Sequence, residues 1–233
     1  MSDDLQQLKL ANGWLLDRVS ARFPCGVRQY TMVEFNDPLV GPSYNTTSKK
    51  QFDDFFNNLV ASGGGDCPEN AAQGLRLALD TSPPRSFILV LTDASAKDYN
   101  ETSIVNHVYS LINTKQSQVY FLITGLCSSP SDPDFLIYRN IAASSFGHVF
   151  QVSLSDLGKV FNYLDFTLSR PVNSSTHLFS RDFNFSGNHS QSFQTAQKYN
   201  TLVVTTDGFI SHMRIVGPDG RHESNSAQFH ASQ

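Results

Sequence analysis

Positive charge is scarce in this sequence of 233 residues. Lysine and arginine number 17 against 21 aspartate and glutamate residues, so the formal net charge is −4, and the basic residues form no cluster. A nucleic-acid-binding protein needs a basic surface to neutralise phosphates, and this composition excludes that class. Long apolar runs are missing as well. The longest, Phe87 to Leu91, is far below the roughly 20 residues of a membrane-spanning helix, so we expect no transmembrane segment.

The sequence also has few cysteines and no familiar catalytic motif. Cys25, Cys67 and Cys127 are too few and too scattered for a disulfide-rich miniprotein or a zinc framework. The Gly-x-Ser-x-Gly, phosphate-loop and His-Glu-x-x-His motifs are absent, and Gly63 to Gly65 lack the third glycine of a dinucleotide-binding turn. We therefore expect a protein without enzymatic activity, with a cofactor-binding α/β enzyme as the least favoured alternative.

A signal peptide is not recognisable, because the chain begins Met1-Ser2-Asp3-Asp4 and no apolar stretch follows. The chain nevertheless contains five N-glycosylation sequons, at Asn45, Asn100, Asn173, Asn184 and Asn188. This number favours a secreted glycoprotein over chance occurrence. Two explanations stay open at this point: an intracellular chain with unused sequons, or a secreted protein whose native N-terminal region lies upstream of this sequence.

Apolar strands alternate with amphipathic helices through the first 170 residues. The patterns predict helices over residues 3–19, 51–60, 66–80, 104–112, 135–143 and 156–168, and strands over 28–35, 43–47, 86–91, 118–124 and 147–152. Strands that are apolar on both faces and separated by helices are typical of a parallel sheet that helices cover on both sides. We expect an α/β fold with a doubly wound, mostly parallel sheet.

The character of the sequence changes near residue 170. Residues 171–233 are rich in serine, asparagine and phenylalanine, contain short β-prone segments separated by turns such as Asp207-Gly208, and end in a polar tail from Arg221. We therefore divide the chain into a domain over residues 1–170 and a partial β-rich, sandwich-like module over residues 171–233.

Acidic residues gather where the predicted sheet would bind a ligand. Asp93 follows the strand 86–91, Asp66 and Glu69 open the helix 66–80, and Asp3 and Asp4 open the first helix. Open α/β sheets bind ligands beyond the carboxyl ends of their strands. Carboxylate oxygens suit Mg²⁺ or Ca²⁺. These five residues are our candidate metal ligands.

Each acidic residue also has a purely structural interpretation. Asp66 and Glu69 have the spacing of a capping box, with Pro68 in the first turn of the helix. Asp93 would cap the turn that follows its strand, and Asp3 and Asp4 would favour the positive end of a helix dipole. The metal hypothesis depends on the convergence of all three clusters at one edge of the sheet.

Several longer motifs resemble one family. They are VEFNDPLVGP (33–42), GGGDCPE (63–69), SFILVLTDASAKDY (86–99), QSQVYFLITGLC (116–127) and SSFGHVFQV (144–152). Together they resemble the von Willebrand factor A domain, and within that family the A domains of the hemicentin group of extracellular matrix proteins. The resemblance covers residues 1 to 170, and the β-rich module is similar, with lower specificity, to the region that follows the A domain in that group.

The resemblance implies a metal-ion-dependent adhesion site and a function in the extracellular matrix. Asp93 matches the third-loop aspartate of such sites and Glu69 the second-loop ligand, while Asp66, Asp3 and Asp4 match ligands of neighbouring cation sites. In the complete domain, Mg²⁺ or Ca²⁺ would take its last ligand from an acidic side chain of an extracellular protein partner. A structural matrix domain that works without metal is the first alternative.

The sequence departs from the family pattern at its beginning. Met1 occupies the position that directly follows the Asp-x-Ser/Thr-x-Ser motif in the family, so this motif and the first strand, which lies in the middle of the sheet, are missing. We expect a fragment or a mis-started gene product that folds poorly alone and binds Mg²⁺ weakly or not at all. Cys67 and Cys127 both fall on loops at the same edge, where a disulfide and two free buried thiols are both open.

Overall fold

The computed structural model describes residues 2–22, 26–61, 67–153 and 156–168, together with residues 187–188, 190–194, 214 and 216 of the C-terminal region. The predicted β-rich module therefore lies almost entirely outside the described residues, as do the boundary near residue 170 and the segment with Asp66. Within the described part of the chain, no helix is long and apolar enough to cross a membrane.

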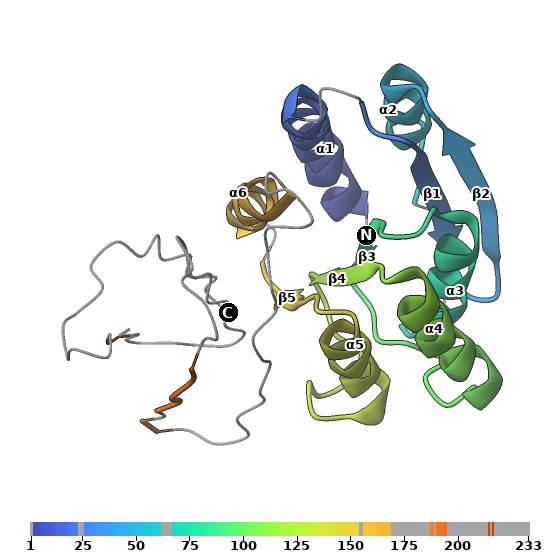
Figure 1. The fold of residues 1–233 in the computed structure, drawn as a ribbon. Helices are drawn as coiled ribbons and strands as arrows, with labels where there is room; N and C mark the ends of the chain where they lie inside the picture. Colours follow the sequence, from blue (N-terminus) through green and yellow to red (C-terminus); the bar gives the residue numbers. More distant parts are fainter. Residues whose placement is uncertain are drawn as a thin grey trace.

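A parallel sheet forms the centre of the molecule (Figure 1). It consists of β3 (Phe87–Thr92), β4 (Gln118–Ile123) and β5 (Val149–Gln151), in the order β3-β4-β5 and with both pairs parallel. The helices α4 (Thr102–Lys115) and α5 (Pro133–Ser144) connect these strands. This alternation confirms the predicted α/β fold class, and it follows from apolar strands that need cover on both faces.

A separate antiparallel hairpin lies beside the parallel sheet. It consists of β1 (Tyr30–Phe35) and β2 (Val40–Thr46), paired from Tyr30 opposite Thr46 to Phe35 opposite Val40. The turn between the strands is closed by the N–H of Asn36, which donates to the carbonyl of Leu39 at 2.8 Å. The strands of the described residues thus form two sheets rather than one.

Two layers of helices cover these sheets (Figure 1). On one face, α1 (Ser2–Arg22), α2 (Lys49–Asn57) and α6 (Leu157–Leu168) supply Leu8, Leu15, Phe56, Phe161 and Leu164 to a buried apolar cluster. On the other face, α3 (Ala71–Thr81), α4 and α5 supply Leu75, Leu79, Val108, Ile112 and Ile141 to a second cluster. Both clusters are built around side chains of β3 and β4.

The beginning of α3 differs from the prediction. The sequence pattern places the start of this helix at residue 66, but the helix begins at Ala71. The residues before it are held in an extended bridge to the loop after β3, in which Glu69 pairs with Ala96. The capping-box interpretation is therefore wrong, because Glu69 precedes the N-cap residue Asn70 instead of lying in the first turn of the helix.

Candidate functional site at the carboxyl ends of the parallel strands

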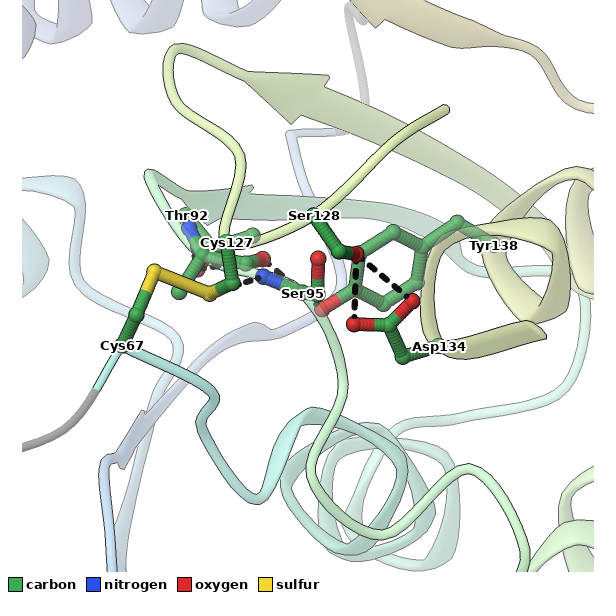
Figure 2. The surroundings of a disulfide bond; sticks show 8 residues. Cys67, Thr92, Ser95, Cys127, Ser128, Asp134 and Tyr138 are labelled. Atoms are coloured by element: carbon green, nitrogen blue, oxygen red, sulfur yellow. Dashed lines mark hydrogen bonds between the residues drawn. A yellow bond between two sulfur atoms is a disulfide. The ribbon is translucent and has the colours of Figure 1, made fainter. Parts of the chain in front are cut away.

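Three loops meet at the carboxyl ends of β3 and β4, and a disulfide joins two of them (Figure 2). Cys67 precedes α3, Cys127 follows β4, and their sulfur atoms are bonded although the residues are 60 positions apart. The backbone N–H of Ser95, in the loop after β3, donates to the sulfur of Cys127 at 3.3 Å. The disulfide therefore fastens the loop before α3 to the loop after β4, and the hydrogen bond from Ser95 fastens the loop after β3 to the same cysteine.

Glu69 is fixed by its backbone two residues after this disulfide. Its N–H donates to the carbonyl of Ser95 at 3.0 Å, and its carbonyl accepts from the N–H of Lys97 at 2.7 Å. These two bonds form a short parallel bridge between the loop before α3 and the loop after β3. Since Asp93 lies only two residues before Ser95, the fold brings the loops of Glu69 and Asp93 to the same edge of the sheet.

The backbone of Asp93 is packed tightly against Gly125. A Cβ atom at Gly125 would lie only 2.5 Å from the carbonyl oxygen of Asp93, so a side chain at this position would displace one of the two loops. On the other side, the N–H of Ala94 donates to the hydroxyl of Thr92 at 3.2 Å, and the buried Tyr138 hydroxyl donates to the Ala94 carbonyl at 3.1 Å. Asp93 therefore sits on a rigid support.

The loop after β4 has a polar network of its own (Figure 2). The hydroxyl of Ser128 lies 2.9 Å from both carboxylate oxygens of Asp134, and the Asp134 carbonyl accepts from the N–H of Ala96 at 3.0 Å. The Ser95 side chain is completely buried beside this network, and its hydroxyl has no hydrogen-bond partner among the described residues. Burial raises the pKa of Tyr138, which keeps its hydroxyl protonated as a donor.

Asp98 is a structural residue that sequence reasoning missed. Its side chain is 5% exposed and accepts hydrogen bonds from the backbone N–H groups of Ala72 at 3.0 Å and Gln73 at 2.7 Å. It therefore caps the first turn of α3 from a loop 26 residues away along the chain. Burial raises the pKa of the Asp98 carboxyl group, and the backbone hydrogen bonds partly oppose this rise.

The turn of the hairpin reaches the same edge. The carboxylate of Asp37, just after β1, forms an ion pair with the amino group of Lys97. The side-chain amide of Asn70 donates to the other carboxylate oxygen of Asp37 at 3.3 Å. Four loops, from both sheets, therefore converge on this edge. We call it the rim and define it by residues 37, 67–70, 93–98 and 125–128.

The comparison with known proteins agrees with this arrangement. Residues 1–154 match the family model of the von Willebrand factor A domain. The chain belongs to the von Willebrand factor A domain family. Its similarity to mouse (Mus musculus) Hemicentin-2 is 30% identity over 221 residues, which is 95% of this chain and 4% of that protein.

Other relatives match shorter stretches of this chain. Human (Homo sapiens) Hemicentin-1 is 36% identical over 182 residues, which is 78% of this chain and 3% of that protein. Human von Willebrand factor A domain-containing protein 7 is 42% identical over 95 residues, 41% of this chain and 10% of that protein. The solved structure of conserved hypothetical protein BatB from Bacteroides thetaiotaomicron is 14% identical with a TM-score of 0.47, covering 71% of this chain and 86% of that one. The chain spans only a small part of each curated relative that it matches.

The candidate metal ligands of the A domain are only partly described. Glu69 and Asp93 lie on the rim, whereas Asp66 and the side chains of Asp3 and Asp4 lie outside the described residues. Within the described part of the chain, no group of three or more histidine, cysteine, aspartate or glutamate side chains is placed so that it could hold a metal ion. The described side chains alone therefore do not fit a cation site.

The predicted glycosylation sites differ in their surroundings. Asn45 is exposed on β2, and its side-chain oxygen accepts from Gln29 at 3.0 Å and Thr31 at 2.8 Å. Asn100 is exposed in the loop before α4, and Asn188 is also exposed. Asn173 and Asn184 lie outside the described residues. Exposure of a sequon is a requirement for a glycan, and glycosylation at all five positions stays a prediction.

Proposed function

We propose that this A domain is a non-enzymatic adhesion module that binds a protein partner of the extracellular matrix at the rim. The observation that carries the proposal is that the Glu69 loop is fastened to the loop after β4 by a disulfide and to the Asp93 loop by a backbone bridge. A binding edge made from loops must be rigid, because each loop that has to be ordered on binding lowers the affinity. The sequons and the disulfide support an oxidising, extracellular environment.

The finer part of the proposal concerns the cation. In the complete domain, Glu69 and Asp93 would contribute carboxylate ligands to Mg²⁺ or Ca²⁺, Asp66, Asp3 and Asp4 would serve neighbouring cations, and a partner would offer an acidic side chain. Because the described side chains do not form a ligand set by themselves, we expect this chain to bind Mg²⁺ only weakly, with a dissociation constant above about 1 mM, or not at all.

Calorimetry with Mg²⁺ tests the role of the two carboxylates. The weak heat of binding should disappear in Asp93→Asn and Glu69→Gln. It should be unchanged in Asp54→Asn, which removes an exposed carboxylate on α2 that forms an ion pair with Lys50. Mg²⁺ binding that survives both rim substitutions would show that the ligands have been assigned to the wrong residues.

A cell-adhesion assay separates the two candidate functions. The alternative is a matrix domain that works without metal. With Mg²⁺ present above the dissociation constant expected for this chain, we expect cells to attach to the immobilised chain better than in EDTA, and better than to Asp93→Asn. Attachment that is equal in EDTA and Mg²⁺, and equal for both proteins, would establish the metal-independent function instead.

A further inference from the structure

The two cysteines of the rim disulfide differ in exposure. Cys67 is exposed, whereas Cys127 is partly buried. The backbone just before Cys127 is closely packed, because Gly125 lies against the carbonyl oxygen of Asp93 and Leu126 packs against the apolar cluster of α3, α4 and α5. A thiol dissolved in water therefore reaches the sulfur of Cys67 more readily than the sulfur of Cys127.

Hydrogen bonding also distinguishes the two sulfur atoms. The backbone N–H of Ser95 donates to the sulfur of Cys127 at 3.3 Å (Figure 2). On the other side of the disulfide, the start of α3 uses backbone N–H groups of its first turn to bind the carboxylate of Asp98. A hydrogen bond to an ionised acceptor is stronger than one to a neutral acceptor, and a thiolate is stabilised accordingly. The Ser95 N–H therefore favours a negative charge on Cys127.

These two differences correspond to the two requirements of thiol–disulfide exchange. In that reaction a thiolate attacks one sulfur of a disulfide, and the other sulfur leaves with the electron pair of the broken bond. The attacked sulfur must be accessible, which applies to Cys67. The leaving sulfur must carry the charge, which the hydrogen bond from Ser95 supports at Cys127. Exposure and hydrogen bonding thus indicate the same direction of reaction.

We propose that the disulfide is a thiol-exchange site, which takes up a thiol from another molecule at Cys67. The incoming thiolate forms a new S–S bond with the sulfur of Cys67, and the bond to Cys127 breaks. Cys127 leaves as a thiolate and then takes a proton from water. One disulfide is exchanged for another, so the step consumes no oxidant. The inference does not depend on the proposed function of the rim.

Exchange would change how the rim is held together. The loop before α3 would lose its covalent connection to the loop after β4, while the backbone bridge from Glu69 to the loop after β3 would remain. The attached molecule would lie two residues before Glu69. A small thiol and a cysteine of a protein can both supply the attacking thiolate. The chain itself has a third cysteine, Cys25, so a second copy is one protein source.

Glutathione is the probe for this proposal, applied to the full chain in its folded state. Any thiol that is free at the outset is blocked with iodoacetamide, glutathione is added, and the reaction is stopped at early times with N-ethylmaleimide. Trypsin places Cys67 and Cys127 in different peptides, residues 51–76 and 116–139, which mass spectrometry distinguishes. We expect glutathione on peptide 51–76 and N-ethylmaleimide on peptide 116–139, in at least about tenfold excess over the reverse labelling.

The same reaction in urea is the control for the role of the fold. In the unfolded chain both sulfur atoms are accessible and Ser95 no longer holds its position beside Cys127, so the two labelling patterns should become about equal. A second arm leaves all thiols unblocked and omits glutathione. A disulfide that joins residue 25 of one copy to residue 67 of another would identify a second copy as a source of the thiol and would support the proposal.

Three results would overturn the proposal. The first is glutathione found equally on both peptides, or mainly on peptide 116–139, when the chain is folded. The second is a disulfide that stays intact in the folded chain although glutathione reacts readily in urea, because exchange would then require unfolding. The third is a link between copies that joins residue 25 to residue 127, since Cys127 would then be the attacked sulfur.

Discussion

The parallel sheet and the β1–β2 hairpin are fixed in the molecule by different means. β4 is buried along almost its whole length, and the loops at its end are joined by a disulfide and a backbone bridge. No residue of β2 is fully buried, and the hairpin is attached through side-chain contacts such as the pair Asp37–Lys97. Core burial along almost its whole length therefore stabilises β4, whereas the hairpin is held by a few buried side chains of β1, such as Met32, and by side-chain pairs such as Asp37–Lys97.

The largest expected difference between the regions comes from matched phenylalanine substitutions. Phe121 on β4 is 1% exposed and stacks on Tyr138 with ring centroids 4.7 Å apart. Phe121→Ala should lower the free energy of unfolding by about 4 kcal/mol. Phe35→Ala on β1, where the ring is only partly buried, should cost about 2 kcal/mol. Urea unfolding measures both losses. Equal losses would show that the hairpin is stabilised by core burial as much as the parallel sheet is.

Removal of the disulfide should have the next largest effect. It closes a loop of about 60 residues, so Cys67→Ser combined with Cys127→Ser should lower stability by about 3 kcal/mol. Amide hydrogens around Glu69 should exchange faster, while those of β1 and β2 should change less, because neither cysteine belongs to the hairpin. Dithiothreitol should destabilise the parent chain and leave the double variant unchanged. If amide exchange increased equally in all elements, the disulfide would not act locally on the loops that it joins.

The substitution Gly74→Ala tests the packing contact between α3 and β1. A Cβ atom at Gly74 would lie 2.8 Å from the Cβ and Cγ atoms of Phe35, so the hairpin must move away from the helix. We expect a loss of about 2 kcal/mol. The control is Gly158→Ala on α6, where a Cβ atom meets nothing within 4 Å, and no loss is expected there. If the two variants were equally stable in urea, the contact between Gly74 and Phe35 would be able to adjust to a larger side chain without loss.

A smaller effect should appear as a pH dependence that belongs to the parallel sheet. Burial, with help from the charge of Arg139, lowers the pKa of His148 next to β5 from 6.5 to about 4. The unfolded chain therefore takes up the proton at a higher pH, and stability should fall as the pH drops from 6.5 towards 4. Between about pH 7 and about pH 5.5 the loss should be about 1 kcal/mol.

The contribution of His148 to the pH dependence of stability is obtained by comparing the parent chain with His148→Gln. The raised pKa of Asp98 acts in the opposite sense, since its contribution to stability increases as the pH falls through its folded value. The difference between the parent and His148→Gln cancels this contribution. His107→Gln is the matched control, because this histidine is about half exposed and should leave the slope intact. If the pH dependence of stability were the same in His148→Gln as in the parent chain, His148 would not be its cause.

The smallest effect is expected at the ion pair between the two regions. Lys97 is 40% exposed, so Lys97→Ala should cost at most about 1 kcal/mol, and the loss should shrink at high salt. Thermal melting in low and high salt measures this. A much larger loss would mean that Lys97 and Asp37 hold the hairpin more firmly than an exposed pair can.

Local patterns predicted most of the elements of the fold. The strands at residues 86–91 and 118–124 were predicted because both are continuous apolar runs, and they form β3 and β4. The start of α3 could not be predicted. The bonds that keep Glu69 extended come from Ser95 and Lys97, and the cap of the helix comes from Asp98. These partners lie more than 25 residues downstream and leave no periodic signal near Glu69.

For the same reason, only a part of the candidate site could be predicted. The loops of Glu69 and Asp93 follow from their positions beside predicted elements, and the fold brings them together at the rim. A ligand set needs several side-chain oxygens within a few ångströms of one point, and spacing along the chain does not specify that. The convergence of all three acidic clusters stays a prediction, because Asp66 and the side chains of Asp3 and Asp4 lie outside what the structure describes.

Residue types at short, regular spacing were enough to predict the alternation of strands and helices and the α/β class, and longer motifs were enough to show the resemblance to the A domain. The pairing of Cys67 with Cys127, the cap from Asp98 and the division into two sheets at β1 and β3 became visible only in the folded chain. Backbone groups and sulfur atoms take partners according to their distance in space, and those distances are set by the folded chain and not by the spacing of residues along it.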